Sequence, residues 1–304
     1  MSTSIQQPDF DVIVIGGSYA GLSAALQLAR ARRRILIIDN GRRRNRFAQN
    51  SHGFLTQDGS TAAGIAAVGR AQLEEYPNVA WANETVVSAG GEKGRFEVEF
   101  PDGGVATAQR LVLATGVVDL LPPVVGLAER WGTSVFHCPY CHGYELGSGK
   151  IGVLSVGEIS MHHALMLPDW GSVTFFLNGT FILDDAQRAA LARRGVTLEE
   201  THVKRIIDVA DVELVDGRLL PMKGLFVASR THGMSKLAGQ LGCAVEEGPT
   251  GDFVTTDTMK ATTVSGVFSC GDMARPAGNV AFAVADGAMA GVAAHRSLIA
   301  ELNY

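Results

Sequence analysis

The amino-acid sequence predicts an α/β protein built from two Rossmann-like domains, the second inserted in the first. A β–α–β pattern opens the chain at residues 12–38, a second one begins at residue 151, and a last strand and helix follow from residue 266. The length of 304 residues corresponds to about two domains, and a hydrophobic content of 46% is ample for their cores.

The first β–α–β unit consists of two apolar runs with a turn and a helix between them. Residues 12–15 are β-branched side chains, typical of a buried parallel strand. A glycine-rich turn at residues 16–21 and a helical pattern over residues 22–30 come next. A second buried strand over residues 35–38 completes the unit and ends at Asp39.

Three further elements are expected in the first domain. Residues 62–73 form a helical pattern rich in small side chains. Residues 96–100 alternate between apolar and polar side chains, which predicts a half-exposed strand ended by the turn at residues 101–104. Residues 111–113 are a buried strand that runs into Ala114, Thr115 and Gly116.

The second domain follows a proline-containing linker at residues 121–123. After the second domain, a strand and turn at residues 266–272 and a long helix over residues 280–302 are expected to belong to the first domain again. Within the second domain, the pattern predicts strands at residues 151–154, 173–177 and 224–228, and a helix at residues 161–167.

Charge and hydropathy exclude several classes of function. A net charge of -5 argues against nucleic-acid binding, and the arginine runs at residues 32–34 and 42–44 are short enough to be solvated charges. No stretch approaches the ~18 apolar residues of a membrane helix, so we expect no membrane partner and a cytoplasmic location.

Four cysteines are too few for a disulfide scaffold. Cys138 and Cys141 form a CxxC pair, and two cysteines at this spacing can form a disulfide or share one electron pair. A closed zinc site needs four ligands, so a single CxxC predicts redox chemistry and no metal. Cys243 and Cys270 stand alone in the sequence and are expected to be small buried side chains.

The glycine-rich turn has the pattern of a dinucleotide-binding fingerprint. Gly16, Ser18 and Gly21 occupy its three glycine positions, and Asp39 lies 23 positions beyond Gly16. The first glycine permits a tight turn, the last allows close helix–strand packing, and the helix N-terminus offers N–H groups to a pyrophosphate. The acidic side chain can accept hydrogen bonds from ribose hydroxyls.

These motifs occur together in one known family. Over nearly its whole length the chain resembles the low-molecular-weight thioredoxin reductases, with Ala114-Thr115-Gly116, the CxxC pair, Gly271-Asp272 and the ending at residues 281–295 in matching order. The resemblance implies FAD as cofactor, a homodimer, an FAD-binding domain of residues 1–117 and 245–304, and a middle domain of residues 118–244 that carries the CxxC pair. The FAD contacts that it implies are Gly16, Gly17, Ser18, Ala20, Gly21, Asp39, Asn40, His52, Ala114, Thr115, Gly116, Gly271, Asp272 and Val280.

The chain departs from those reductases at the second nucleotide site. Ser155, Gly157 and Ser160 occupy the places of a GxGxxA turn, so only one glycine remains. Residues 177–179, where the reductases carry arginines for the 2′-phosphate of NADPH, hold no charge. Two missing arginines remove charge-assisted bonds worth about 1.5–3 kcal/mol each. The second site is therefore predicted to be degenerate, and the spacing does not support Arg193 or Arg194 as substitute phosphate binders.

A second departure follows the cysteines, where His142 replaces the aspartate of the reductases. In this respect the chain resembles the FAD-dependent dithiol oxidases of gliotoxin and holomycin biosynthesis. By that resemblance Cys138 exchanges with substrate and Cys141 faces the flavin. His142, with an ordinary pKa near neutrality, is expected to move a thiol proton; its other interpretation is a capping or packing residue.

The sequence therefore predicts an FAD-dependent dithiol:disulfide oxidoreductase that passes electrons to an acceptor such as dioxygen without NADPH. The alternatives are a thioredoxin reductase-like disulfide reductase fed by NADPH or ferredoxin, and a flavin-bound sensor without turnover. A small-molecule dithiol and a thioredoxin-like protein are both open as substrates. The expected role of His52 is either beside the flavin or as an ordinary loop residue, and His162 and His163 are expected to be structural.

Overall fold

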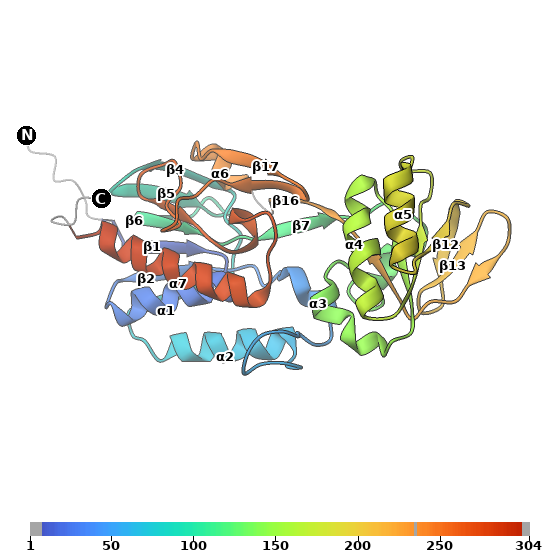
Figure 1. Cartoon of the computed structure of the whole chain (residues 1–304). Coiled ribbons are helices and arrows are strands. Elements are labelled where there is room, and N and C mark those ends of the chain that lie inside the picture. The colour runs from blue at the N-terminus through green and yellow to red at the C-terminus, as the bar shows by residue number, and fades with distance from the viewer. Residues whose placement is uncertain (1–7, 234–235, 300–304) are drawn as a thin grey trace, which may run out of the picture. The chain divides into compact units, whose positions relative to one another are not determined.

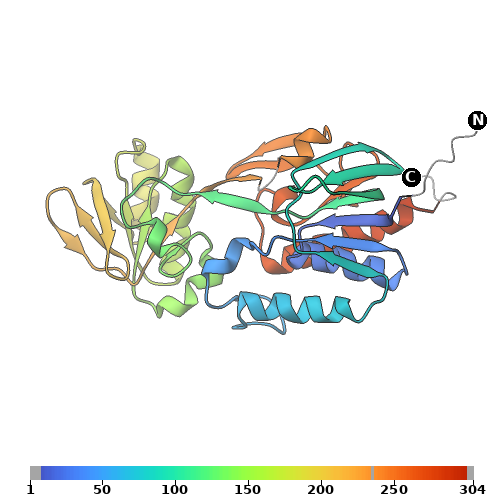
Figure 2. The same ribbon diagram turned by 180° about the vertical axis from the view of Figure 1, so that it is seen from behind.

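The computed structural model describes residues 8–233 and 236–299, which divide into two compact units. The first unit comprises the described parts of residues 1–44, 63–118 and 231–304, and the second comprises residues 45–62 and 119–230. Figures 1 and 2 show both from opposite sides. The predicted assignment of residues 1–117 and 245–304 to FAD, with a middle domain of residues 118–244, stays a prediction.

A seven-stranded sheet forms the centre of the first unit, in the order β3-β2-β1-β6-β5-β4 with β19 also beside β6. The strands β1, β2, β3, β6 and β19 are parallel, whereas β4 and β5 form an antiparallel hairpin. Their bounds are β1 Phe10–Ile15, β2 Ile35–Ile38, β3 Val79–Ala82, β4 Ser88–Glu92, β5 Arg95–Glu99, β6 Val105–Leu113 and β19 Val267–Ser269.

One face of this sheet is covered by three helices, α1 (Tyr19–Arg30), α2 (Ala62–Glu74) and α7 (Val280–Ser297) (Figure 1). Helices α1 and α7 can cross closely because Gly287 has no side chain. A Cβ at this position would overlap the carbonyl of Ala20. The other face packs against α6 (Leu237–Gln240) and the hairpin of β17 (Val245–Gly248) and β18 (Gly251–Val254). These two apolar layers fix the position of the sheet edge that carries the glycine fingerprint.

Helix α7 ends earlier than the sequence predicts. The expected helix runs over residues 280–302, but α7 ends at Ser297, and the part beyond residue 299 lies outside the described residues. The guanidinium of Arg110 donates to the Ser297 backbone carbonyl and, at 2.8 Å, to its Oγ. The buried guanidinium thus donates a hydrogen bond to a carbonyl at the C-terminal end of the helix, where a positive charge stabilises the helix most.

The second unit contains a five-stranded parallel sheet in the order β11-β10-β9-β15-β8. Helices α4 (Met161–Met166) and α5 (Asp185–Arg193) cover one face, and an antiparallel sheet of three strands packs on the other. The strands are β8 Val135–Phe136, β9 Lys150–Leu154, β10 Ser172–Phe176, β11 Thr197–Glu199, β12 Val203–Ile207, β13 Asp211–Leu214, β14 Leu219–Leu220 and β15 Gly224–Val227.

The chain passes between the units at β7 (Val117–Leu120) and β16 (Arg230–Gly233). Most of the second unit is therefore inserted in the sequence of the first, and each unit has a parallel sheet opened by a β–α–β pattern. This confirms the predicted fold class of two Rossmann-like domains. Among the described residues, no helix is both long and apolar enough to span a membrane.

The core of the second unit contains a histidine, His163 of α4, with only 5% of its surface exposed. Its ring packs edge-on against Phe226 and His137, which places it structurally as the sequence predicts. Burial is the main cause that lowers its pKa from 6.5 to about 3, and the nearby His137 and His162 add to the effect. His163 is therefore uncharged in the folded protein at neutral pH.

We expect the variant His163→Gln to resist acid better than the parent protein. Because the pKa of His163 is lower in the folded state, the unfolded chain binds the proton first, and stability is lost as pH falls from about 6.5 toward 3. At pH 5 this linkage corresponds to about 2 kcal/mol. Urea unfolding at pH 7.5 and pH 5 measures it, with the exposed His202→Gln as control. Equal acid sensitivity of both variants would contradict the assignment.

Candidate active site

The CxxC pair forms a disulfide in the second unit, between Cys138 and Cys141, whose Cα atoms lie 5.3 Å apart. Cys138 is the N-cap of the one-turn helix α3 (Pro139–His142), with extended backbone angles. Pro139 at the first helical position fits there because its missing N–H has no partner in a helix start. Gly143 ends the turn where a Cβ would approach the Trp170 ring at 2.8 Å. Both cysteines are partly exposed, so an incoming thiol can reach the pair.

His142 lies directly after the disulfide and stacks on Phe136, with ring centroids 4.3 Å apart and an angle of 19° between the planes. Burial is the largest influence and lowers its pKa from 6.5 to about 4. The predicted pKa near neutrality for His142 is therefore wrong for the oxidised protein, because burial lowers this pKa and keeps the ring uncharged at pH 7. A neutral imidazole can accept a thiol proton, but it supplies no positive charge to stabilise a thiolate.

Three further ionisable groups belong to this neighbourhood. The Nδ1 atom of His52 lies 3.5 Å from Glu145 Oε1 and 3.6 Å from Asp58 Oδ1. Glu145 is part of the short helix η3 (Tyr144–Leu146), just beyond His142, whereas His52 comes from the segment of residues 45–62. Glu145 was not singled out in the sequence, although it follows His142 by three positions. The structure thus places His52 beside the end of the CxxC motif.

Aromatic side chains flank the disulfide. Tyr140, between the two cysteines, is 72% exposed, and Tyr144 is 85% exposed. The Tyr140 ring meets Trp170 edge-on with centroids 5.4 Å apart. The segment that carries the cysteines thus presents two aromatic rings to solvent.

Apart from His52, the predicted cofactor residues gather at one edge of the first unit. The parallel register pairs Ile15 with Ile38 and Leu113, and Leu113 with Ser269, so β1, β2, β6 and β19 end at the same level. Ligands of open α/β sheets bind outside the carboxyl ends of such strands. The segments that follow these four strands contain Gly16 to Gly21, Asp39 and Asn40, Ala114 to Gly116, and Gly271 and Asp272.

The local geometry at this edge fits a dinucleotide cofactor. A Cβ on Gly16 would overlap the Ala114 carbonyl, and one on Gly21 would overlap the Gly16 carbonyl, so both turns need glycine. Helix α1 has no acidic residue in its first turn, and its N-cap Ser18 makes no side-chain cap bond among the described residues. Its positive end is therefore available to a pyrophosphate. Asp39 follows β2 and lies beside Gly17.

Asp272 is the second residue of the helical turn η6 (Gly271–Ala274) and forms an ion pair with Arg44 at 2.8 Å. Val280 begins α7, whose N-cap Asn279 accepts a hydrogen bond from the Phe282 N–H. The sequence interpretation of Arg44 as a solvated charge is therefore wrong, because its side chain is half-buried and paired across 228 positions. No local signal in the arginine run indicates this partner.

The turn after β9, the expected second nucleotide site, binds its own side chains. The Val156 N–H donates to Ser160 Oγ at 2.9 Å, and the Gly157 N–H donates to Ser155 Oγ at 3.3 Å. Ser155 Oγ is also 2.5 Å from Thr180 Oγ1, which joins the turns after β9 and β10. In a dinucleotide site, N–H groups of this turn face the pyrophosphate. Here the hydroxyl oxygens of two serines accept hydrogen bonds from two of those N–H groups.

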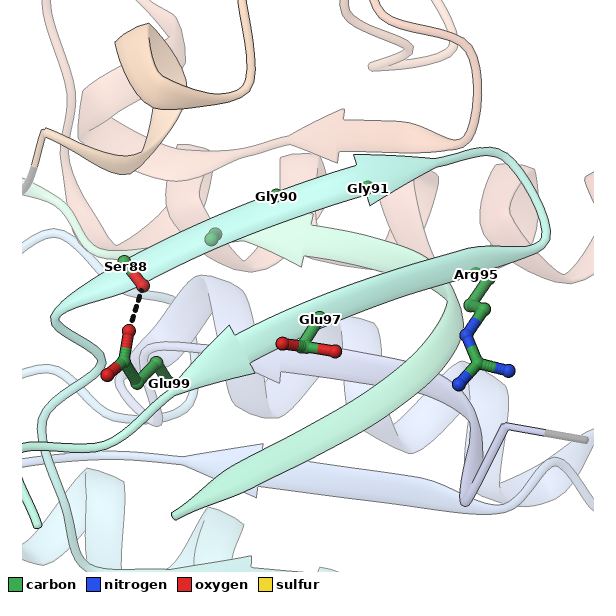
Figure 3. A pocket seen from close by; sticks show the side chains of 7 residues that line it. Ser88, Gly90, Gly91, Arg95, Glu97 and Glu99 are labelled. Carbon is green, nitrogen blue, oxygen red and sulfur yellow. Dashed lines mark hydrogen bonds between the residues drawn. The ribbon is translucent and has the colours of Figure 1, made fainter. Parts of the chain in front are cut away.

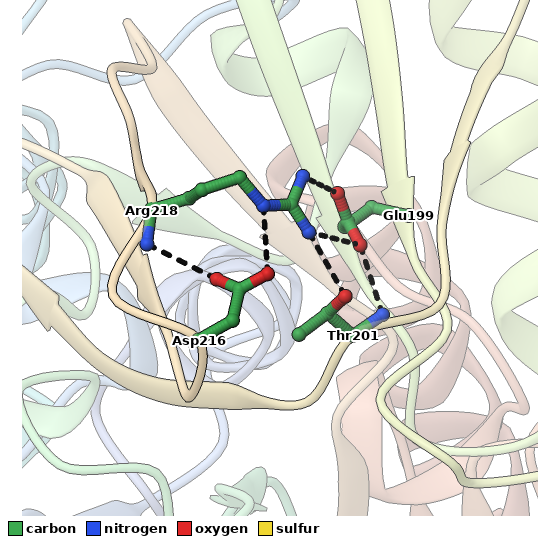
Figure 4. Close-up of polar contacts among 4 residues, drawn as sticks. All are labelled: Glu199, Thr201, Asp216 and Arg218. Atoms are coloured by element: carbon green, nitrogen blue, oxygen red, sulfur yellow. Dashed lines mark hydrogen bonds and ion pairs between the residues drawn. The ribbon is translucent and has the colours of Figure 1, made fainter.

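Two arginines of the second unit are paired with carboxylates. Arg218 donates to both carboxylate oxygens of Glu199, at 2.7 and 3.1 Å, and to Asp216 at 2.7 Å (Figure 4). The hydrogen bond with Arg218 is the main cause that lowers the pKa of Glu199 to about 2. Arg194, considered above as a phosphate binder, instead pairs with Asp169 at 2.7 Å.

The two remaining cysteines and a surface hollow belong to the first unit. Cys243 and Cys270 are buried, as expected, and burial raises the pKa of Cys270 to about 12. An open hollow of about 470 Å³ lies on the hairpin of β4 and β5 (Figure 3). Its lining is polar and contains no cysteine or histidine: Ser88, Ala89, Gly90, Gly91, Arg95, Glu97 and Glu99.

A disulfide oxidoreductase of the two-domain type is defined by the disulfide, the glycine edge and two parallel sheets, one in each unit. The family model "Pyridine nucleotide-disulphide oxidoreductase" matches residues 10–291, and the chain belongs to this family. The chain is 34% identical over 303 residues to "Thioredoxin reductase sirT" of Leptosphaeria maculans, and this match covers 93% of the chain and 92% of that relative.

Solved structures agree with this family. An oxidoreductase from Agrobacterium tumefaciens is 57% identical, with a TM-score of 0.93 over 95% of this chain and 98% of that one. The protein HlmI is 36% identical, with a TM-score of 0.88 over 95% and 92% of the two chains. The resemblance to thioredoxin reductase-like flavoproteins is confirmed. The chain is therefore an oxidoreductase that acts on thiols and disulfides, and its family implies a flavin cofactor.

Proposed function

We propose that the chain is an FAD-dependent dithiol oxidase that works without a pyridine nucleotide. The observation that carries this proposal is the pairing of a CxxC disulfide with a second nucleotide turn whose N–H groups bind its own serines. The disulfide is the oxidant that a dithiol requires, and the occupied turn lacks the donors that a nicotinamide dinucleotide requires.

The reaction begins at Cys138. A substrate thiol gives its proton to the neutral imidazole of His142, and the thiolate attacks Cys138 Sγ. The new substrate–Cys138 bond replaces the Cys138–Cys141 bond, and Cys141 leaves as a thiolate. His142 releases the first proton to water and accepts the proton of the second substrate thiol, whose thiolate attacks the substrate sulfur of the mixed disulfide and releases Cys138 as a thiolate. The substrate loses two protons and two electrons, and the two cysteines gain the electrons.

FAD would be held at the glycine edge of the first unit. Gly16 and Gly21 allow the close approach of its pyrophosphate to α1, Asp39 accepts from its ribose hydroxyls, and Asp272 serves its ribitol chain. When bound, FAD supplies the two-electron acceptor that restores the Cys138–Cys141 disulfide and delivers the electrons to a final acceptor, most simply dioxygen.

The charges around the second turn support independence from NADPH. Glu158, at the start of the helical turn η4 (Glu158–Ser160), places a carboxylate where a pyrophosphate would need positive surroundings, and Gln187 holds it at 2.8 Å. Arg218 and Arg194 are committed to carboxylates. A 2′-phosphate would have to compete with these carboxylates for either arginine.

We expect dithiothreitol, and neither NADPH nor NADH, to bleach the flavin of the purified holoenzyme under anaerobic conditions. Absorbance near 450 nm is followed while each reductant is added in stoichiometric amount, and air is then admitted. The expected result is loss of colour with dithiothreitol alone and its return within seconds in air. Rapid bleaching by NADPH would identify a reductase instead, and recolouring over minutes would identify a sensor without turnover.

The proposed substrate is a small dithiol, and the exposed rings of Tyr140 and Tyr144, close to the cysteines in sequence, are apolar groups that it could contact. A thioredoxin-like protein is the other candidate, and rates with the two substrates separate them. Homodimer formation and a cytoplasmic location stay predictions. The exposed side chains of Phe282, Met289 and Val292 on α7 are the apolar groups that a second copy would cover.

A further inference from the structure

Asp286 is a buried carboxylate of α7 that the proposed reaction does not use. Its side chain is 9% exposed, and each of its two oxygens binds a different cation. Oδ1 lies 2.9 Å from Lys260 Nζ, and Oδ2 accepts a hydrogen bond of 3.1 Å from Arg275 Nη1. The two cations are 17% and 27% exposed, so the three charges form one partly desolvated cluster. Ion pairs in such surroundings are stronger than pairs in water.

The crossing of α7 with α1 holds Asp286 at a defined place. The next residue, Gly287, lies at this crossing, where an added Cβ would overlap the Ala20 carbonyl. Ala20 belongs to the first turn of α1 and is one of the expected FAD contacts. A side chain that binds Asp286 is therefore held in register with the glycine edge.

The first cation, Lys260, lies in a turn that has hydrogen bonds of its own. The Lys260 carbonyl accepts the Ser269 N–H at 3.0 Å. One oxygen of Asp257 accepts the N–H groups of Met259 and Ala261 at 2.8 and 2.9 Å. The turn therefore keeps its shape without the ammonium group of Lys260.

The second cation, Arg275, begins a segment of a different kind. Residues 275–279, all of which the structure describes, join η6 to α7 without helix or strand. Gly278 of this segment lies against Asp272, the expected ribitol partner, because an added Cβ would overlap Asp272 Oδ1. The Arg275 guanidinium also stacks on the Phe282 ring of α7 at 4.4 Å. A displacement of Arg275 is therefore passed both to Asp272 and to the start of α7.

We propose that Asp286 and Arg275 are positioning residues that hold the segment of residues 275–279, and with it Asp272, in the geometry that retains the flavin. This inference rests on the proposed cofactor site at the glycine edge and adds a clamp to it. Neither residue has to touch the cofactor, because both act through Asp272. Lys260 binds the same carboxylate but belongs to a turn that does not contact Asp272.

The composition of the cluster provides a matched pair of variants. Two cations share one carboxylate, so Arg275→Met and Lys260→Met each leave a single ion pair on Asp286. Neither variant leaves a buried carboxylate without a partner, which is the costly case, so both are expected to fold. Methionine keeps an unbranched stem and removes the charge and its donors. Both variants should lose a similar amount of stability, because each loses one ion pair of similar length and burial.

The release of flavin from the holoenzyme tests the clamp. Each holoenzyme is diluted, and the fluorescence of the released flavin is followed with time. Arg275→Met is expected to release flavin about tenfold faster than the parent, because the segment loses a charge-assisted hydrogen bond. Lys260→Met should stay within about twofold of the parental rate. Urea unfolding followed by circular dichroism should show a similar fall of the midpoint in both variants.

Equal release rates from the two variants would overturn the clamp. Rates equal to the parental rate would show that Arg275 does not hold the cofactor segment, and equally raised rates would show a general loss of stability. Asp272→Ala tests the proposed cofactor site itself, because it removes the carboxylate and keeps the clamp. Parental release from Asp272→Ala would refute that site. Fast release from Asp272→Ala together with parental release from Arg275→Met would leave the site standing and refute the clamp. Neither result depends on which reductant bleaches the flavin.

Discussion

Replacing Cys141 or Cys138 with serine is expected to abolish dithiol oxidation while the protein keeps its flavin. Exchange requires a thiolate as nucleophile and a sulfur as leaving group, and a serine hydroxyl provides neither near neutral pH. The loss should exceed about 10³-fold, typical for removal of a covalent catalytic group. Both side chains belong to the second unit and the glycine edge belongs to the first, so flavin content should stay at the parental level.

The two serine variants should also differ from each other. Cys141→Ser keeps the thiol of Cys138, which can still be trapped as a mixed disulfide, whereas Cys138→Ser removes the sulfur that the substrate attacks. Mass spectrometry after incubation with an asymmetric aromatic disulfide is expected to detect an adduct mainly on Cys141→Ser. Cys243→Ser, which changes a buried cysteine of the first unit, should retain turnover within about twofold. Dithiol oxidation at the parental rate by either CxxC variant would refute the scheme.

The sequence predicts those strands whose side chains form an unbroken apolar run. The strands β1, β2 and β9 are buried on both faces, so their sequences alone distinguish them from their surroundings. The three-stranded sheet of β12, β13 and β14 is missed because only one of its faces packs on the core. Its charged residues, such as Arg205 and Glu213, pair across strands in a way that no local pattern indicates.

The candidate site likewise has features that are local in sequence, which could be predicted, and features that depend on tertiary structure, which could not. The CxxC pair and the glycine turn are local in sequence, and the structure places both where their spacing indicates. The contact between His52 and Glu145 joins positions far apart in the chain, and the low pKa of His142 arises from burial against Phe136. Burial and distant pairing are tertiary properties, so composition and spacing could not give them.

The degenerate second turn is an intermediate case. Replacement of one glycine and of the alanine by serine is visible in the sequence, but the consequence depends on where the two hydroxyls point. Ser160 could have faced solvent, and instead accepts the N–H of Val156. Small polar residues in a glycine turn can therefore replace the ligand as hydrogen-bond partners, and this is a stronger argument against nucleotide binding than loss of glycine alone.

The variant Gly21→Ala is expected to lose its flavin almost completely. A Cβ at this position would overlap the carbonyl oxygen of Gly16 and approach Val14 Cγ1 at 3.3 Å, so the turn after β1 and helix α1 must move apart. That movement removes the N–H groups of α1 from the place where a pyrophosphate would bind. Flavin content per protein, measured from the visible spectrum after purification, is expected to fall at least about tenfold, because a displaced phosphate cradle loses several charge-assisted bonds.

Failure of Gly21→Ala to fold must be separated from failure to bind. Gly239→Ala is the control, since a Cβ there meets nothing within 4 Å, and it should keep both fold and flavin. Asp39→Ala leaves the turn intact and removes one hydrogen-bond acceptor, so it should fold normally and bind FAD about 10- to 100-fold more weakly. Circular dichroism reports the fold of each variant. A folded Gly21→Ala and Asp39→Ala that both hold flavin as tightly as the parent would place the cofactor elsewhere, because the two changes act on the same edge of the sheet through unrelated physical causes.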